Sequence, residues 1–136
     1  MGSEPEAQVT AQPRRVLVVE DELMIRMLLE DMLGELGYTV SAAAARLDEA
    51  MQAAQEGEFD IAILDVNLNG ESISPVADVL AARGIPFVLA TGYGEGGMPD
   101  GYRDRPALKK PFQLHNLKHT LEAALAAGSR AAKDQQ

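Results

Sequence analysis

Continuous apolar runs of strand length recur along this chain and alternate with segments of helical periodicity. The first run is RVLVV at residues 15–19, and two more are FDIAIL at 59–64 and IPFVLA at 85–90. A strand that is apolar on both faces needs a cover on both faces, as in a parallel sheet flanked by helices. We therefore predict an α/β protein built on a doubly wound parallel sheet.

The segments between these runs complete the pattern. From Ile25 to Leu36 the apolar residues step by three and four, which predicts an amphipathic helix that Gly37 ends. Short strands are predicted over residues 38–42 and 107–109, and further helices over residues 47–56, 74–83 and 113–127. The chain should then hold five strands and at least four helices.

Length, charge and composition limit what the chain can be. A chain of 136 residues, 46% of them hydrophobic, has room for one domain. We expect that domain over residues 14–127, with flexible polar tails over 1–13 and 128–136. The net charge of −9 disfavours nucleic acid as a partner, since such binding relies on Lys and Arg. Without cysteine or an apolar segment of membrane-spanning length, we expect a cytoplasmic protein with no membrane partner.

One segment interrupts the alternation. Residues 92–105, GYGEGGMPDGYRDR, stand where a fourth helix would precede the last strand. In a helix interior each Gly costs about 1 kcal/mol relative to Ala, and Pro about 3 kcal/mol. A stable helix is therefore not expected there, and we predict a short or mobile element that orders conditionally.

Acidic and polar residues stand at the ends of the predicted strands. Glu20 and Asp21 follow the first strand, Asp65 follows the third, Thr91 follows the fourth and Lys110 follows the fifth. In an open parallel sheet, ligands bind beyond the carboxyl ends of the strands. We therefore expect these side chains to meet in one site.

The residue types at these strand ends suit phosphoryl transfer. Converging carboxylates repel one another, and a cation that prefers oxygen ligands, such as Mg²⁺, relieves that repulsion. Asp65 is then the candidate nucleophile, which would form an aspartyl phosphate. Thr91 and Lys110 could each neutralise one phosphoryl oxygen. Alternation along the strand lets only one of Lys109 and Lys110 face the site, and we assign Lys110.

These residues together resemble the motif set of response-regulator receiver domains, and the resemblance covers residues 14–127. The motifs are Glu20-Asp21, Asp65, Thr91 and Lys110-Pro111-Phe112. The resemblance implies a flavodoxin-like sheet of order 2-1-3-4-5 and phosphoryl transfer from a sensor histidine kinase to Asp65. It also implies that Asp21, Asp65 and the backbone carbonyl of Asn67 bind Mg²⁺ directly, while Glu20 acts through water.

A narrower resemblance concerns residues 86–94, PFVLATGYG. They are similar to the motif of the FAT GUY receivers, stand-alone regulators of alphaproteobacteria, although Val88-Leu89 separates Phe87 from Ala90. This resemblance implies a kinase of the HWE or HisKA_2 type, and an output by protein contact or by draining phosphate from a relay. Receivers usually carry an aromatic switch residue where this chain has Ala107, so Tyr93 becomes the candidate switch.

Other interpretations of the same residues stay open. A phosphatase of the haloacid dehalogenase type also uses an Asp nucleophile with Mg²⁺, but it needs a second Asp where this chain has Asn67. A degenerate receiver could act as an adaptor without phosphate, which Ala107 keeps open. Met24 and Met27 fit either the core or a docking surface. We expect a signalling phosphoacceptor rather than an enzyme.

Overall fold

The protein is described by a computed structural model that covers residues 13–92 and 98–134. A sheet of five parallel strands, in the order β2-β1-β3-β6-β7, forms its centre. The strands are β1 (Arg15–Val19), β2 (Thr39–Ala44), β3 (Ile61–Asp65), β6 (Phe87–Thr91) and β7 (Ala107–Lys109). Counted along the chain, these sheet strands have the predicted order 2-1-3-4-5, so the flavodoxin-like fold is confirmed.

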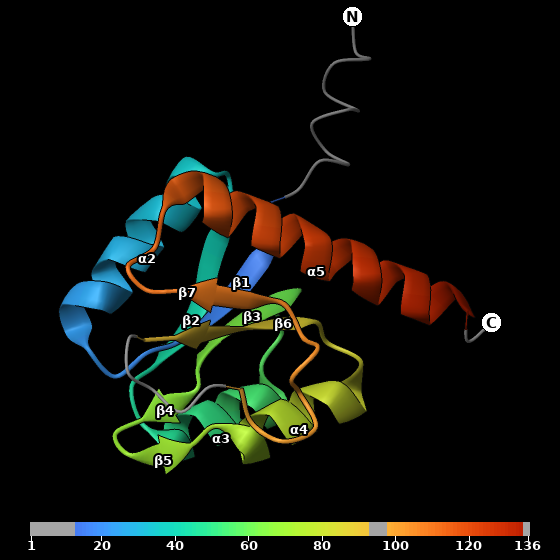
Figure 1. Ribbon diagram of the computed structural model, residues 1–136, viewed down its shortest axis with the longest axis horizontal. Helices are drawn as coiled ribbons and strands as arrows, with labels where there is room; N and C mark the ends of the chain where they lie inside the picture. The colour runs from blue at the N-terminus through green and yellow to red at the C-terminus, as the bar shows by residue number, and fades with distance from the viewer. Residues whose placement is uncertain (1–12, 93–97, 135–136) are drawn as a thin grey trace, which may run out of the picture.

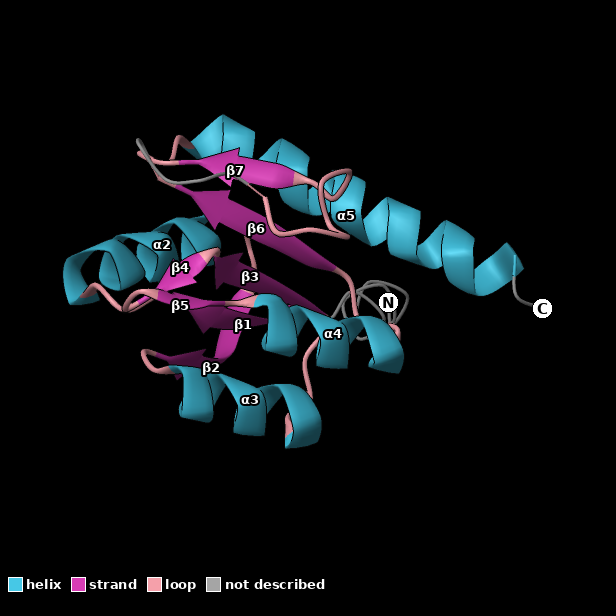
Figure 2. Cartoon of the chain, turned by 60° about the horizontal axis from the view of Figure 1, so that its bottom comes forward, coloured by secondary structure: helices cyan, strands magenta, loops and turns pink. Residues whose placement is uncertain are grey.

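Two helices cover each face of the sheet (Figures 1 and 2). On one side lie α2 (Leu23–Glu35) and α5 (Leu114–Asp134), and on the other lie α3 (Leu47–Glu56) and α4 (Ser74–Arg83). Alternate residues of β1 enter the two layers, since Val18 packs with the α2 and α5 side and Leu17 with the α3 and α4 side. Because each central strand is buried on both faces, its run is apolar throughout. Among the described residues, no helix is both long and apolar enough to cross a membrane.

The last helix is longer than the sequence predicts. We expected it to end near Ala127 and residues 128–136 to form a flexible tail, but α5 continues to Asp134. The predicted helix end at Ala127 is therefore wrong. A single Gly costs a helix only about 1 kcal/mol, and the following Arg130, Ala131, Ala132 and Lys133 are good helix formers. Most of the expected N-terminal tail lies outside the described residues.

A short hairpin directly after β3 was not predicted. The two-residue strands β4 (Asn67–Leu68) and β5 (Glu71–Ser72) pair antiparallel through a turn at Asn69 and Gly70. Both turn residues have positive φ, 54° and 83°, which a tight hairpin turn requires and which Asn and Gly tolerate best. The Asn-Gly pair was thus a sequence signal for this turn.

The segment that leads into β7 contains turns and no helix over residues 98–106, as expected; residues 93–97 lie outside the described part. It is anchored by its side chains. The ring of Tyr102 meets the ring of Phe87 edge-on at 5.6 Å, and the Arg105 guanidinium lies over Phe87 at 4.5 Å. The Tyr102 hydroxyl also donates a hydrogen bond to Asp78 of α4. The segment therefore connects β6 with α4.

Candidate functional site

The register of the sheet brings the strand ends together. Val19 pairs with Leu64, so Glu20 follows β1 at the level where β3 ends on Asp65. Asp65 in turn pairs with Ala90, and Thr91 pairs with Lys109. Since the strands are parallel, the residues just beyond these pairs lie at one edge of the sheet. This is the edge at which we expected the site.

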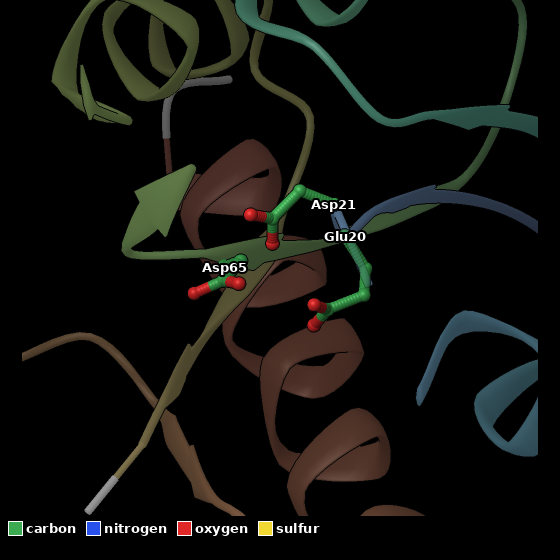
Figure 3. A group of neighbouring side chains, drawn as sticks. All are labelled: Glu20, Asp21 and Asp65. Carbon is green, nitrogen blue, oxygen red and sulfur yellow. The ribbon is translucent and has the colours of Figure 1, made fainter. Parts of the chain in front are cut away.

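Three carboxylates meet at this edge (Figure 3). Glu20, Asp21 and Asp65 each offer an oxygen, and these atoms lie within 4.8 Å of one another. Glu20 and Asp65 are each only 2% exposed, whereas Asp21 is partly exposed. Within residues 13–92 and 98–134 this is the one group of three or more acidic or histidine side chains close enough to share a metal ion. The expected convergence of the acids is confirmed.

Lys110 reaches into the same space. Its Nζ lies 3.0 Å from Oε1 of Glu20 and 3.1 Å from Oδ2 of Asp65. Its backbone N–H donates to the carbonyl of Thr91, and the Lys110–Pro111 peptide bond is cis. Lys109 is exposed, so the choice of Lys110 over Lys109 as the residue facing the site is confirmed.

The partly buried Lys110 and the buried Glu20 affect each other's pKa. Burial by itself would lower the pKa of Lys110, but its hydrogen bonds to Glu20 and Asp65 outweigh burial and raise that pKa. Lys110 is therefore a cation at neutral pH. Burial raises the pKa of Glu20 to about 7, and the charge of Asp65 raises it too, against the opposing effect of Lys110. In the metal-free protein Glu20 thus takes up a proton near neutral pH.

Each of the three carboxylates also accepts a hydrogen bond from the backbone. The N–H of Glu22 donates to Glu20 at 3.1 Å, that of Asn67 donates to Asp65 at 3.2 Å, and that of Asn69 donates to Asp21 at 3.2 Å. Such bonds stabilise the charged form of a carboxylate and fix its direction. The carboxylates are therefore oriented by the loops that follow β1 and β3.

The donor set fits a hard divalent cation. It consists of three carboxylates in a mostly buried space, with Lys110 as the neighbouring cation. Mg²⁺ binds through one or two carboxylates and keeps several waters, and the partly exposed Asp21 leaves water access to the group. The side-chain oxygen of Asn67 accepts a hydrogen bond from the N–H of Gly70 at 2.8 Å. The side chain of Asn67 therefore has a structural role in the loop.

The structure describes some of the remaining predicted residues and leaves one outside the described part. Thr91 ends β6 at the edge where Asp65 ends β3, and it is partly buried. Tyr93 lies outside the described residues. Met24 and Met27 are 83% and 55% exposed, so assignment of these two residues to the core is wrong. The sequence analysis also missed Asn69, whose N–H donates a hydrogen bond to Asp21. The Asn69-Gly70 pair, which is typical of a hairpin turn, was the available sequence signal.

The chain matches known proteins over most of its length. The model of the family described as "Response regulator receiver domain" matches residues 16–122. The transcriptional regulatory protein PdtaR of Mycobacterium tuberculosis is 34% identical over 120 residues, which is 85% of this chain. The match covers 58% of PdtaR, so the chain spans little more than half the length of that relative.

Solved structures agree with this match. The solution structure of SdrG from Sphingomonas melonis Fr1 has a TM-score of 0.77 and 43% identity, covering 85% of this chain and 98% of that one. The receiver domain of the PhyR response regulator from Erythrobacter litoralis has a TM-score of 0.72 and 30% identity, covering 85% and 92%. Both are similar to this chain in sequence as well as in fold.

The raised pKa of Glu20 predicts a pH-dependent stability. Because the pKa rises from 4.5 to about 7 on folding, the stabilisation from its proton is fully present below about pH 4.5 and is lost as pH rises through about 7. We therefore compare the free energy of unfolding of Glu20→Gln with that of the wild type. This difference should favour the variant more at about pH 8 than at about pH 5. The change in that difference should reach up to about 3 kcal/mol.

Urea denaturation with a chelator present measures this difference at the two pH values. Glu58→Gln is the matched control, because the side chain of Glu58 is 83% exposed. An effect of Glu20→Gln on the free energy of unfolding that is equal at both pH values would contradict the prediction.

Proposed function

This chain belongs to the response regulator receiver family, and we propose that it accepts a phosphoryl group on Asp65 from a sensor histidine kinase of a two-component phosphorelay. The observation that carries the proposal is the placement of Asp65. Its carboxylate is buried at a strand end, 3.1 Å from the Lys110 ammonium and beside two further carboxylates. A carboxylate so placed is a nucleophile with a cation ready for the incoming charge.

In the proposed reaction, an oxygen of Asp65 attacks the phosphorus of a phosphohistidine. The new O–P bond forms as the P–N bond breaks, and the leaving imidazole retains the bonding electron pair and takes up a proton. Lys110 and the Thr91 hydroxyl would each neutralise one phosphoryl oxygen. Asp21, Asp65 and the backbone carbonyl of Asn67 would hold Mg²⁺, with Glu20 acting through water. When bound, the ion supplies positive charge for the transferring group.

We further propose that the chain is a phosphoacceptor rather than a phosphatase that turns over substrates. A phosphatase of the haloacid dehalogenase type needs an acid two residues after its nucleophile to move a proton. Asn67 occupies that position, and its side-chain carbonyl is engaged by Gly70. An amide cannot donate and recover a proton at neutral pH.

The finer assignment is to the FAT GUY receivers, with a kinase of the HWE or HisKA_2 type and an output by protein contact or phosphate drainage. The motif at residues 86–94 supports it. The domain itself would span residues 14–127. Ala107, at the usual place of the aromatic switch, is exposed on β7. We propose that Thr91 moves onto the phosphoryl group and that the Gly-rich segment then orders, with Tyr93 as the switch residue.

The first prediction is that Asp65→Asn prevents phosphorylation, because an amide nitrogen or oxygen is a poor nucleophile in place of a carboxylate. The wild type, incubated with Mg²⁺ and a small phosphodonor or the cognate kinase, should gain one phosphoryl group by intact mass. Asp100→Asn is the control, since the side chain of Asp100 is 93% exposed and pairs with Arg103. A wild type that takes up no phosphoryl group, or one that turns over a phosphorylated metabolite continuously, would overturn the proposal.

The second prediction concerns the two neighbouring lysines. Lys110→Ala should slow phosphorylation by a small donor on the order of 100-fold, because it removes a cation aimed at the transferring group. Lys109→Ala should leave the rate within about twofold, since Lys109 is exposed and outside the site. The rates are measured at one saturating Mg²⁺ concentration, with circular dichroism showing that both variants fold. Equal rates for the two variants would contradict the role of Lys110.

The third prediction tests the switch. Phosphorylation should slow the motion of backbone amides in residues 92–102, because Thr91 would draw the following Gly-rich segment toward the phosphoryl group. NMR relaxation of these amides, before and after phosphorylation, measures the change, and Tyr93→Ala should reduce it. Amide dynamics that stay the same on phosphorylation would rule out the switch while leaving Asp65 as the acceptor.

A further inference from the structure

The β4–β5 hairpin lies against two of the three carboxylates of the site. The N–H of Asn67 donates to Asp65, and the N–H of Asn69 donates to Asp21, 48 residues away in the chain. The hairpin therefore connects the end of β3 with the acidic loop that follows β1. Its conformation decides where the Asn69 N–H points.

The Asn69 side chain holds that conformation by a hydrogen bond to a residue outside the hairpin. Its Nδ2 donates to the carbonyl of Ala45 at 3.3 Å, in the loop that follows β2. Its backbone has φ of 54°, in the left-handed region that Asn tolerates better than most residues. Asn69 thus contacts two loops, one with its backbone and one with its side chain, while its φ permits the turn.

Asp21 needs such support more than its two neighbours. Lys110 forms ion pairs with Glu20 and Asp65, and no described ion pair includes Asp21. Asp21 is also the most exposed of the three acids, so repulsion from the other two favours its rotation toward water. The hydrogen bond from Asn69, in contrast, favours the orientation toward Asp65.

We propose that Asn69 is a positioning residue that holds Asp21 in the site before a cation binds. The inference rests on the proposed function, since it takes the acidic group as the Mg²⁺ site. A carboxylate already in place binds the ion with less rearrangement, and changes to residues that orient metal ligands typically weaken metal affinity by about 10- to 100-fold. Asn69 acts through Asp21 and touches no reacting atom.

Three substitutions separate the parts of this role. Asn69→Ala removes the bond to Ala45 and places a residue without a local polar side chain in the left-handed region. Asn69→Gly removes the same bond but accepts the positive φ. Asn69→Asp keeps the shape, removes the donor and adds a negative charge near Asp21. Asn116→Ala is the control, because Asn116 is an exposed asparagine of α5.

The experiment is an NMR titration of each unphosphorylated variant with Mg²⁺, followed by phosphorylation rates across Mg²⁺ concentrations and thermal melting without metal. Asn69→Ala should weaken Mg²⁺ binding on the order of 10-fold. Asn69→Gly should have a smaller effect, Asn69→Asp should not restore affinity, and the control should bind as the wild type does. The phosphorylation rate of Asn69→Ala should recover to within about twofold when Mg²⁺ saturates.

Two results would overturn the inference. The first is wild-type Mg²⁺ affinity in Asn69→Ala. The second is a loss of rate that saturating Mg²⁺ does not restore, together with a lower melting temperature in metal-free Asn69→Ala and Asn69→Gly, which would indicate a general loss of structure. The proposed function fails separately, because a wild type that binds Mg²⁺ but accepts no phosphoryl group would contradict that function and leave the effect of Asn69 measurable.

Discussion

The site depends on one partly buried cation, Lys110. Lys110 contacts Glu20 and Asp65 at about the same distance, so it places a positive charge beside two carboxylates that are each 2% exposed. Leaving a buried charge without its partner costs about 3 to 5 kcal/mol. The same ammonium fits the proposed role of Lys110, which is to neutralise charge on a transferred phosphoryl group.

The pocket nevertheless contains more acidic groups than basic ones, and the loops around it donate hydrogen bonds to these acids. The three acids outnumber the single ammonium of Lys110, which favours a divalent cation. Burial, and after it the charge of Asp65, raises the pKa of Glu20. Three backbone amides hold the acids in place, one for each carboxylate. The site therefore favours a cation and also holds its carboxylates in fixed orientations. The short hairpin at Asn69 orients Asp21.

Side-chain contacts tie the segment that leads into β7 to β6 and to α4. Phe87, Tyr102 and Arg105 pack together, and Tyr102 extends to Asp78 on α4. These contacts join the strand that ends on Thr91 to the outer helix α4.

The sequence by itself determined the sheet, its flanking helices and the residues at the strand ends, because apolar periodicity is set by which faces are buried. β1, α3 and β7 have the predicted bounds, and the acids stand at the predicted edge. Tertiary structure alone decided how far α5 continues past Gly128 and that Met24 and Met27 are exposed. It also decided that Asn69 reaches Asp21, since contacts between residues far apart in the chain depend on how the elements pack and leave no periodic pattern in the sequence.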